Sequence, residues 1–157
     1  MFSLNLSVEQ MVAYASRLGA DCAFFIHNRP MIAEGTGSIL HEIQLNLSGK
    51  NLALVIPQIS VNTAKAYANC HPAEPLYKLE ESVKLPLQQW KDHIKNDFEP
   101  TVFAENPMLA EIKSKLYESG AVFAQMSGSG SAIFGIFDEK TLNLDIANCK
   151  IEMIELK

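Results

Sequence analysis

Apolar side chains recur at intervals of three and four over residues 8–18, which predicts an amphipathic helix. Ser7 opens this segment with the pattern of a capping box, and Gly19 follows it at the position where helices commonly end. A continuous apolar run, residues 22–26, comes directly after Asp21. We expect a strand there, because short uninterrupted apolar runs are typical of buried strands.

The rest of the chain alternates between strand and helix patterns. Strands are predicted where apolar runs are bounded by turn residues, at residues 31–47 with a break at 34–37, 52–56, 121–125, 132–137 and 150–156. Helices are predicted at residues 62–68, 87–94 and 98–103, from residue 107 to a stop at Gly120, and at residues 138–148. From residue 52 onward this order predicts an α+β fold with a ferredoxin-like split β-α-β layer, an antiparallel sheet with helices on one face. Residues 1–30 do not fit that module.

Composition narrows the function classes. The chain has 157 residues, of which 48% are apolar, and its 13 basic and 18 acidic side chains give a net charge of −5. This length supports one hydrophobic core without disulfides. The acidic excess argues against nucleic acid as a partner, and no apolar run approaches the roughly 20 residues of a membrane-spanning helix. Cys22, Cys70 and Cys149 lack the spacing of a metal or redox pair, so we expect free thiols and a cytoplasmic location.

Two features could carry chemistry on local grounds alone. The serine- and glycine-rich loop at residues 127–131 lies between two predicted strands, so its backbone could contact a phosphate or could simply turn the chain. Asp21 could orient a substrate hydroxyl or could be an ordinary turn residue. The four histidines share no ligand-like spacing, so no metal site is expected, and Trp90 is expected to anchor the core.

Five blocks occur in an order and at a spacing that resemble the C-terminal half of the 4-diphosphocytidyl-2-C-methyl-D-erythritol kinases, of the GHMP kinase superfamily. They are LGADCAFF at 18–25, AEGTG at 33–37, SVNTAKAY at 60–67, NDFE at 96–99 and MSGSGS at 126–131. The blocks extend over essentially the whole chain, which makes the resemblance far more specific than any one glycine loop.

The resemblance implies roles for individual residues. Asp21 matches the catalytic aspartate, Tyr67 matches an aromatic residue that stacks on the cytosine of the substrate, and Thr63 lies on the same short segment. The loop that matches the third glycine motif, close to the phosphates, consists of Ser127, Gly128, Ser129, Gly130 and Ser131. For the full-length enzyme the family implies ATP and Mg²⁺, with a cytidine-diphosphate sugar alcohol as the substrate that is phosphorylated on its 2-hydroxyl. We expect neither cofactor bound to this chain alone.

The family's lysine-bearing strand and its long glycine- and serine-rich ATP loop have no counterpart in these residues. We therefore expect residues 1–30 to be a helix-strand remnant of the N-terminal kinase domain, residues 31–157 to be the C-terminal domain, and the chain alone to be inactive. The apolar stripe of residues 1–30 should be buried against the second domain or in a homodimer. Two alternatives stay open, namely a non-catalytic α+β ligand-binding or interaction module and the matching half of another GHMP-type kinase.

Overall fold

The computed structural model describes residues 5–19, 21–139 and 144–157. Its contacts divide the chain into two compact units, Met1–Leu45 and Asn46–Lys157, and each is described by itself. The hairpin at residues 31–42 groups with the helices that precede it. In the described part of the chain, no helix is long and apolar enough to span a membrane.

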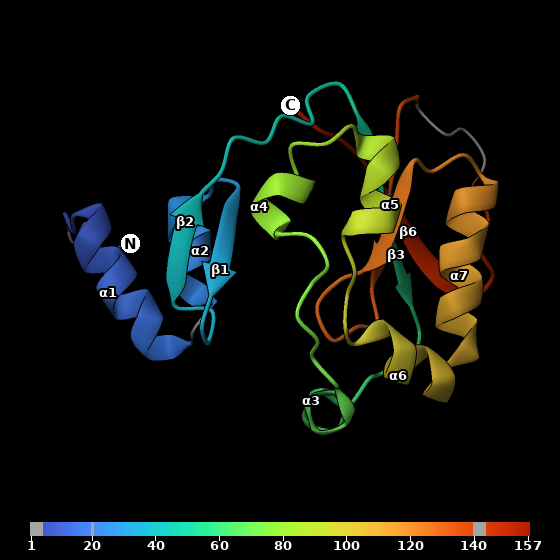
Figure 1. Cartoon of the computed structure of the whole chain (residues 1–157), viewed down its shortest axis with the longest axis horizontal. Helices are drawn as coiled ribbons and strands as arrows, with labels where there is room; N and C mark the ends of the chain where they lie inside the picture. The colour runs from blue at the N-terminus through green and yellow to red at the C-terminus, as the bar shows by residue number, and fades with distance from the viewer. Residues whose placement is uncertain (1–4, 20, 140–143) are drawn as a thin grey trace. The chain divides into compact units, whose positions relative to one another are not determined.

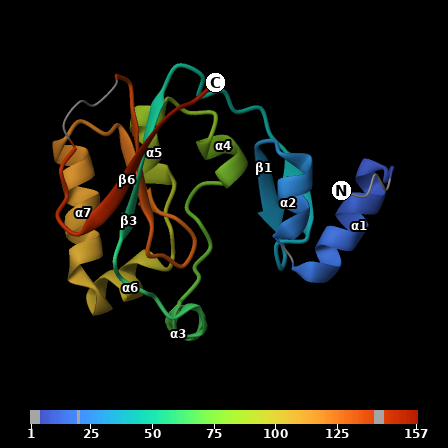
Figure 2. The same ribbon diagram turned by 180° about the vertical axis from the view of Figure 1, so that it is seen from behind.

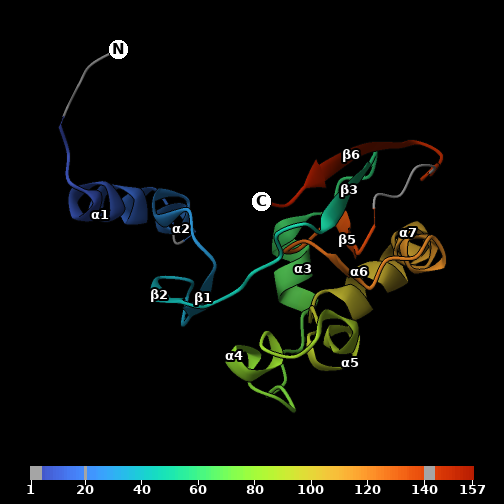
Figure 3. The ribbon, with the colours of Figure 1, turned by 90° about the horizontal axis from the view of Figure 1, so that it is seen from above.

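The first unit contains two helices and a hairpin (Figure 3): α1 (Val8–Leu18), α2 (Cys22–His27), β1 (Met31–Glu34) and β2 (Ile39–Glu42). The predicted capping box is confirmed, because Ser7 Oγ accepts from the Gln10 amide at 3.2 Å while Gln10 Oε1 accepts from the Ser7 amide at 2.9 Å. The strands β1 and β2 pair antiparallel.

The strand expected at residues 22–26 is wrong, because these residues form the helix α2. A run of five apolar side chains has no polar positions to reveal its period, so a short helix and a strand give the same pattern. The packing decides: α2 lies against α1 and buries Ala23, whereas Phe25 stays 73% exposed. Asn28, in the left-handed conformation, ends the helix. Among the described residues up to 30, the elements are thus the helices α1 and α2.

The second unit is built on a four-stranded sheet in the order β4-β5-β3-β6. Its strands are β3 (Asn51–Pro57), β4 (Phe123–Met126), β5 (Ile133–Phe137) and β6 (Cys149–Glu155), and every neighbouring pair is antiparallel. Because β5 pairs with both, β3 and β4 run parallel with β5 between them. This is the split β-α-β arrangement that the sequence predicted.

Helices cover one side of this sheet, as Figures 1 and 2 show from opposite directions. The helical elements are α3 (Thr63–Asn69), α4 (Leu79–Ser82), η1 (Leu87–Gln89), α5 (Trp90–His93), α6 (Glu99–Glu105) and α7 (Pro107–Glu118). Leu109, Ile112 and Leu116 of α7 are almost completely buried with the β3 and β5 side chains. Of the helix predicted at residues 138–148, residues 140–143 lie outside the described residues, and the described residues on either side form no helix.

Trp90 anchors the core of this unit, as predicted. Its side chain is 6% exposed, and its ring meets Phe123 edge-on with centroids 5.5 Å apart. The indole Nε1 donates to the Leu85 carbonyl at 3.1 Å, so the polar atom is satisfied despite burial. The packing holds α5 against β4, the strand that leads into the glycine loop.

Candidate functional site

The loop at residues 127–131 joins β4 to β5 in a conformation that needs its glycines. Gly128 and Gly130 both have positive φ, 55° and 92°. A Cβ atom on Gly130 would lie 2.8 Å from Met126 Sδ, so any larger residue would force that packed side chain to move. The turn is closed by the Gly130 amide, which donates to the Ser127 carbonyl at 3.0 Å. Within the described residues the amides of Gly128 and Ser129 have no acceptor, which leaves them available to an anion.

The structure brings Thr63 of α3 to this loop. The hydroxyls of Ser129 and Thr63 are 3.4 Å apart, although 66 positions separate the residues in sequence. Ser131 Oγ donates to the Ile59 carbonyl at 2.6 Å and so ties the loop to the segment that leads into α3. Asn62 caps α3 through a hydrogen bond from the Lys65 amide to its side-chain oxygen. Thr63 is therefore held at the first turn of a capped helix, beside the glycine loop.

Tyr67 lies one helical turn after Thr63, so both side chains occupy the same face of α3. Its ring is 66% exposed and makes an edge-to-face contact with Phe98, with centroids 4.9 Å apart. The ring is thus supported by Phe98, while most of the residue's surface stays in solvent. An exposed aromatic ring supported in this way can accept a planar ligand by stacking.

Asp21 belongs to the first unit, at the N-cap of α2. Its side chain is exposed and makes no capping hydrogen bond. The carboxylate therefore does not cap the helix and is open to a ligand. Among the described residues, no group of three or more His, Cys, Asp or Glu side chains is placed to hold a metal ion.

A family model described as "GHMP kinases C terminal" matches residues 79–153. This region includes Asn96, Glu99 and the whole glycine loop. Residues 79–153 belong to the GHMP kinase C-terminal family. The matched residues include β4, β5 and most of β6 of the split β-α-β sheet.

Curated relatives extend the similarity beyond the GHMP domain. The chain is 49% identical over 137 residues to the 4-diphosphocytidyl-2-C-methyl-D-erythritol kinase of Bacteroides thetaiotaomicron, covering 87% of this chain and 50% of that one. It is 44% identical over 158 residues to the kinase of the same name from Bacteroides fragilis, covering 99% of this chain and 58% of that one. The chain spans about half the length of the curated relatives it matches.

Solved structures agree with this assignment. A crystal structure of 4-(cytidine 5′-diphospho)-2C-methyl-D-erythritol kinase matches with a TM-score of 0.68 and 27% identity, covering 86% of this chain and 49% of that one. The homoserine kinase of Cytophaga hutchinsonii matches with a TM-score of 0.62 at 14% identity, covering 97% of this chain and 58% of that one. The second likeness concerns the fold alone.

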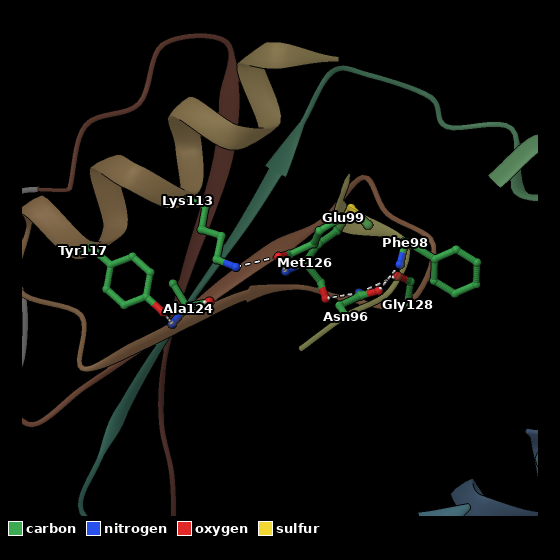
Figure 4. Close-up of polar contacts among 8 residues, drawn as sticks. All are labelled: Asn96, Phe98, Glu99, Lys113, Tyr117, Ala124, Met126 and Gly128. Carbon is green, nitrogen blue, oxygen red and sulfur yellow. Dashed lines mark hydrogen bonds and ion pairs between the residues drawn. The ribbon is translucent and has the colours of Figure 1, made fainter. Parts of the chain in front are cut away.

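Sequence reasoning missed two residues of the GHMP domain (Figure 4): Asn96, which contacts the glycine loop, and Glu99, which contacts the last residue of β4 just before the loop. Asn96 Nδ2 donates to the carbonyls of Met126 and Gly128, both at 2.8 Å, and Glu99 Oε1 accepts from the Met126 amide at 2.8 Å. The NDFE block at 96–99 marked the family resemblance, but its polar side chains gave no sign of their partners. Those partners lie about 30 positions away and become neighbours only in the folded sheet.

The Glu99 carboxylate is the centre of a half-buried polar cluster. Its other oxygen accepts from Lys113 Nζ at 2.6 Å, and the two side chains are 13% and 25% exposed. Nearby, Tyr117 Oη both donates to the Ala124 carbonyl and accepts from the Ala124 amide (Figure 4). Burial is the main cause that raises the pKa of Tyr117, so the phenol keeps its proton and both hydrogen bonds. These contacts fix β4 relative to α6 and α7.

Proposed function

We propose that this chain supplies the cytidine-binding wall and the phosphate-proximal glycine loop of an ATP-dependent kinase that phosphorylates the 2-hydroxyl of 4-diphosphocytidyl-2-C-methyl-D-erythritol, a step of isoprenoid biosynthesis. The observation that carries the proposal is the contact between α3 and the loop at residues 127–131. Through this contact, the helix that carries the Tyr67 ring lies beside the loop that carries the Gly128 and Ser129 amides. A nucleoside diphosphate presents the matching pair of groups, a planar base and two anionic phosphates.

Each residue of the wall has a physical task in this proposal. Tyr67 stacks on the cytosine ring, a contact worth about 0.5–1.5 kcal/mol beyond the area it buries. The Thr63 and Ser129 hydroxyls and the free amides of Gly128 and Ser129 bind phosphate oxygens. Because the loop is built into a hairpin of the sheet, its amides are oriented before the ligand arrives.

Asp21 would hold the substrate hydroxyl in line and take its proton. An ordinary aspartate has a pKa near 3.9, too low for an efficient early base. Phosphoryl transfer has a loose transition state that asks for little deprotonation of the attacking oxygen, so a late proton acceptor suffices. The exposed carboxylate, free of a capping bond, suits that task.

ATP supplies the phosphoryl group in this family's reaction. The loop at residues 127–131 fits an anionic phosphate through its free amides, and Gly130 leaves no room for a side chain. Among the described residues, no three His, Cys, Asp or Glu side chains gather around one point. Magnesium commonly uses one or two carboxylates and takes its other ligands from phosphates and water.

Cytidine diphosphate binding tests the proposal directly. Tyr67→Leu should weaken the binding of cytidine diphosphate to the 157-residue chain by about 3- to 10-fold, the loss expected when one stacking contact is removed. Isothermal titration calorimetry of the two proteins measures the ratio. Tyr77→Leu is the matched control, since Tyr77 is also exposed, at 49%, and packs on His93 rather than beside the loop. Equal losses for both variants, or no binding by the unaltered chain, would refute the proposed site.

We also propose that two copies of the chain pair through residues 1–30 in the cytoplasm. Val8, Leu18 and Phe25 are 50%, 85% and 73% exposed, and all lie in the two helices of this segment. Burying large apolar side chains of this kind stabilises an interface by about 1.5–3 kcal/mol each. The three cysteines are free, as a reducing compartment requires.

Light scattering at tens of micromolar should therefore give the mass of a dimer, and Leu18→Glu together with Phe25→Glu should give a monomer. Ile39→Glu is the control, since Ile39 is an exposed apolar residue of β2 outside residues 1–30. A monomeric parent chain would contradict this part of the proposal.

A further inference from the structure

The turn at residues 96–99 leads from α5 into α6 and contacts the glycine loop. These contacts are made between protein groups alone. The first residue of the turn, Asn96, is mostly shielded from solvent. The side chain points at the loop, as Figure 4 shows. The function proposed above assigns no task to this residue.

The Asn96 carboxamide spans the start of the loop. Its Nδ2 group donates to the carbonyl of Met126, the last residue of β4, and to that of Gly128, the second residue of the loop. Its Oδ1 atom accepts from the Phe98 amide at 2.9 Å, which fixes the amide plane from the other side. Both hydrogens and the oxygen of the carboxamide are thereby used, so the group is held in one orientation.

Holding the Gly128 carbonyl determines where the neighbouring amide points. The carbonyl of Gly128 and the amide of Ser129 belong to one planar peptide unit, on opposite sides of its C–N bond. Because Asn96 binds that carbonyl, the Ser129 amide is directed away from Asn96 and is left without an acceptor in the described chain. Glu99 reinforces the arrangement by holding the Met126 amide, so the Met126 residue is fixed at both its N–H and its carbonyl.

We propose that Asn96 is a positioning residue, whose carboxamide holds the loop at residues 127–131 in the conformation that presents the Gly128 and Ser129 amides to a phosphate. Glycine loops gain conformational freedom readily, so a loop with two glycines in positive φ needs such support to stay ordered. The phosphate part of this inference rests on the proposed function. The ordering of the loop does not.

The first test measures the loop without a ligand. Asn96→Ser keeps a side-chain acceptor for the Phe98 amide, because serine caps as well as asparagine, but it removes the amide donors and adds no charge. In the ¹⁵N-labelled 157-residue chain, steady-state heteronuclear NOE values should fall at Gly128 and Ser129 and stay unchanged in α7. Should Asn96→Ser not fold, Asn96→Asp carries the same test, since it keeps the shape and the acceptor and lacks the donors.

Asn106→Ser is the matched control for this measurement. Asn106 Nδ2 donates to the Val102 carbonyl, within one helical turn and away from the loop. It should leave the NOE values of Gly128 and Ser129 as they are in the unaltered chain. If the loop stays equally rigid in the Asn96 variant, Asn96 does not position it and the inference is wrong.

The second test separates positioning from general loss of stability by using two probes. Inorganic pyrophosphate reports on the loop, and cytidine reports on the Tyr67 ring. Asn96→Ser should weaken pyrophosphate binding about tenfold, the size expected for one or two lost neutral hydrogen bonds, and leave cytidine binding unchanged. Parallel losses of both would indicate a merely structural residue and would overturn the inference. If the unaltered chain binds neither probe, the proposed function fails, while the NOE measurement still decides whether Asn96 orders the loop.

Discussion

Replacing Asp21 by asparagine is expected to lower kcat at least about 100-fold, with little change in KM, because an amide keeps the shape of the side chain but cannot accept the proton of the substrate hydroxyl. The measurement needs a complete kinase. It can be made in a fusion that joins this chain to the part of the Bacteroides thetaiotaomicron relative that it does not cover. ADP release in the presence of 4-diphosphocytidyl-2-C-methyl-D-erythritol then gives kcat and KM for both proteins.

The structure makes this substitution cleaner than it would be at most positions. Asp21 is the N-cap of α2, and its side chain makes no capping hydrogen bond there. Asparagine is as good an N-cap residue as aspartate, so α2 should be equally stable in the variant. Asp145→Asn, at an exposed position of the second unit, controls for the lost charge and should leave kcat unchanged. Full activity of the Asp21→Asn fusion would reduce Asp21 to a turn residue.

The 157-residue chain by itself should show no ATP-dependent phosphorylation, whereas the fusion should be active. Phosphoryl transfer depends almost entirely on positioning and on electrostatic stabilisation of the transferred group. The loop at residues 127–131 provides only part of that environment, through the amides of Gly128 and Ser129. No lysine-bearing strand or long ATP loop of the family occurs among these residues.

A coupled assay of ADP release, run at equal concentrations of the chain and of the fusion, measures the difference. Cytidine diphosphate binding should persist in the isolated chain, which shows that the site is formed although turnover is absent. Substrate-dependent ADP release by the chain alone, abolished by Asp21→Asn, would contradict the prediction. It would mean that residues of this chain complete the ATP site in a way that its family pattern does not suggest.

Local interactions made several elements predictable from the sequence. The capping box of Ser7 and Gln10 and the apolar spacing of α1 act within a few residues, so the sequence pattern is the physical cause of the helix. Pro107 begins α7 for the same kind of reason, since its fixed φ and missing amide suit the first turn. The order of strands and helices after residue 50 then limited the topology to the split β-α-β arrangement, because connections prefer short paths between adjacent strands.

The segment at residues 22–26 shows where local pattern ceases to decide. Its apolar side chains would suit a buried strand or a short helix, and its intrinsic preferences differ by too little to choose. The neighbouring α1 offers a packing surface, and Asn28 adopts the left-handed conformation that ends the helix. Tertiary contact therefore overrides the expectation.

For the candidate site too, the sequence determined some features and the tertiary structure determined others. The sequence by itself predicted Asp21, Thr63, Tyr67 and the glycine loop as site residues, through residue types and through blocks that resemble one family. Only the tertiary structure placed Thr63 against Ser129 and the Asn96 carboxamide across Met126 and Gly128. These partners lie 30 to 66 positions apart, so their contact depends on the register of β4, β5 and β3 and on the packing of α6 and α7 over them. Hydrogen-bonding capacity is a property of a residue, but the choice of partner is a property of the fold.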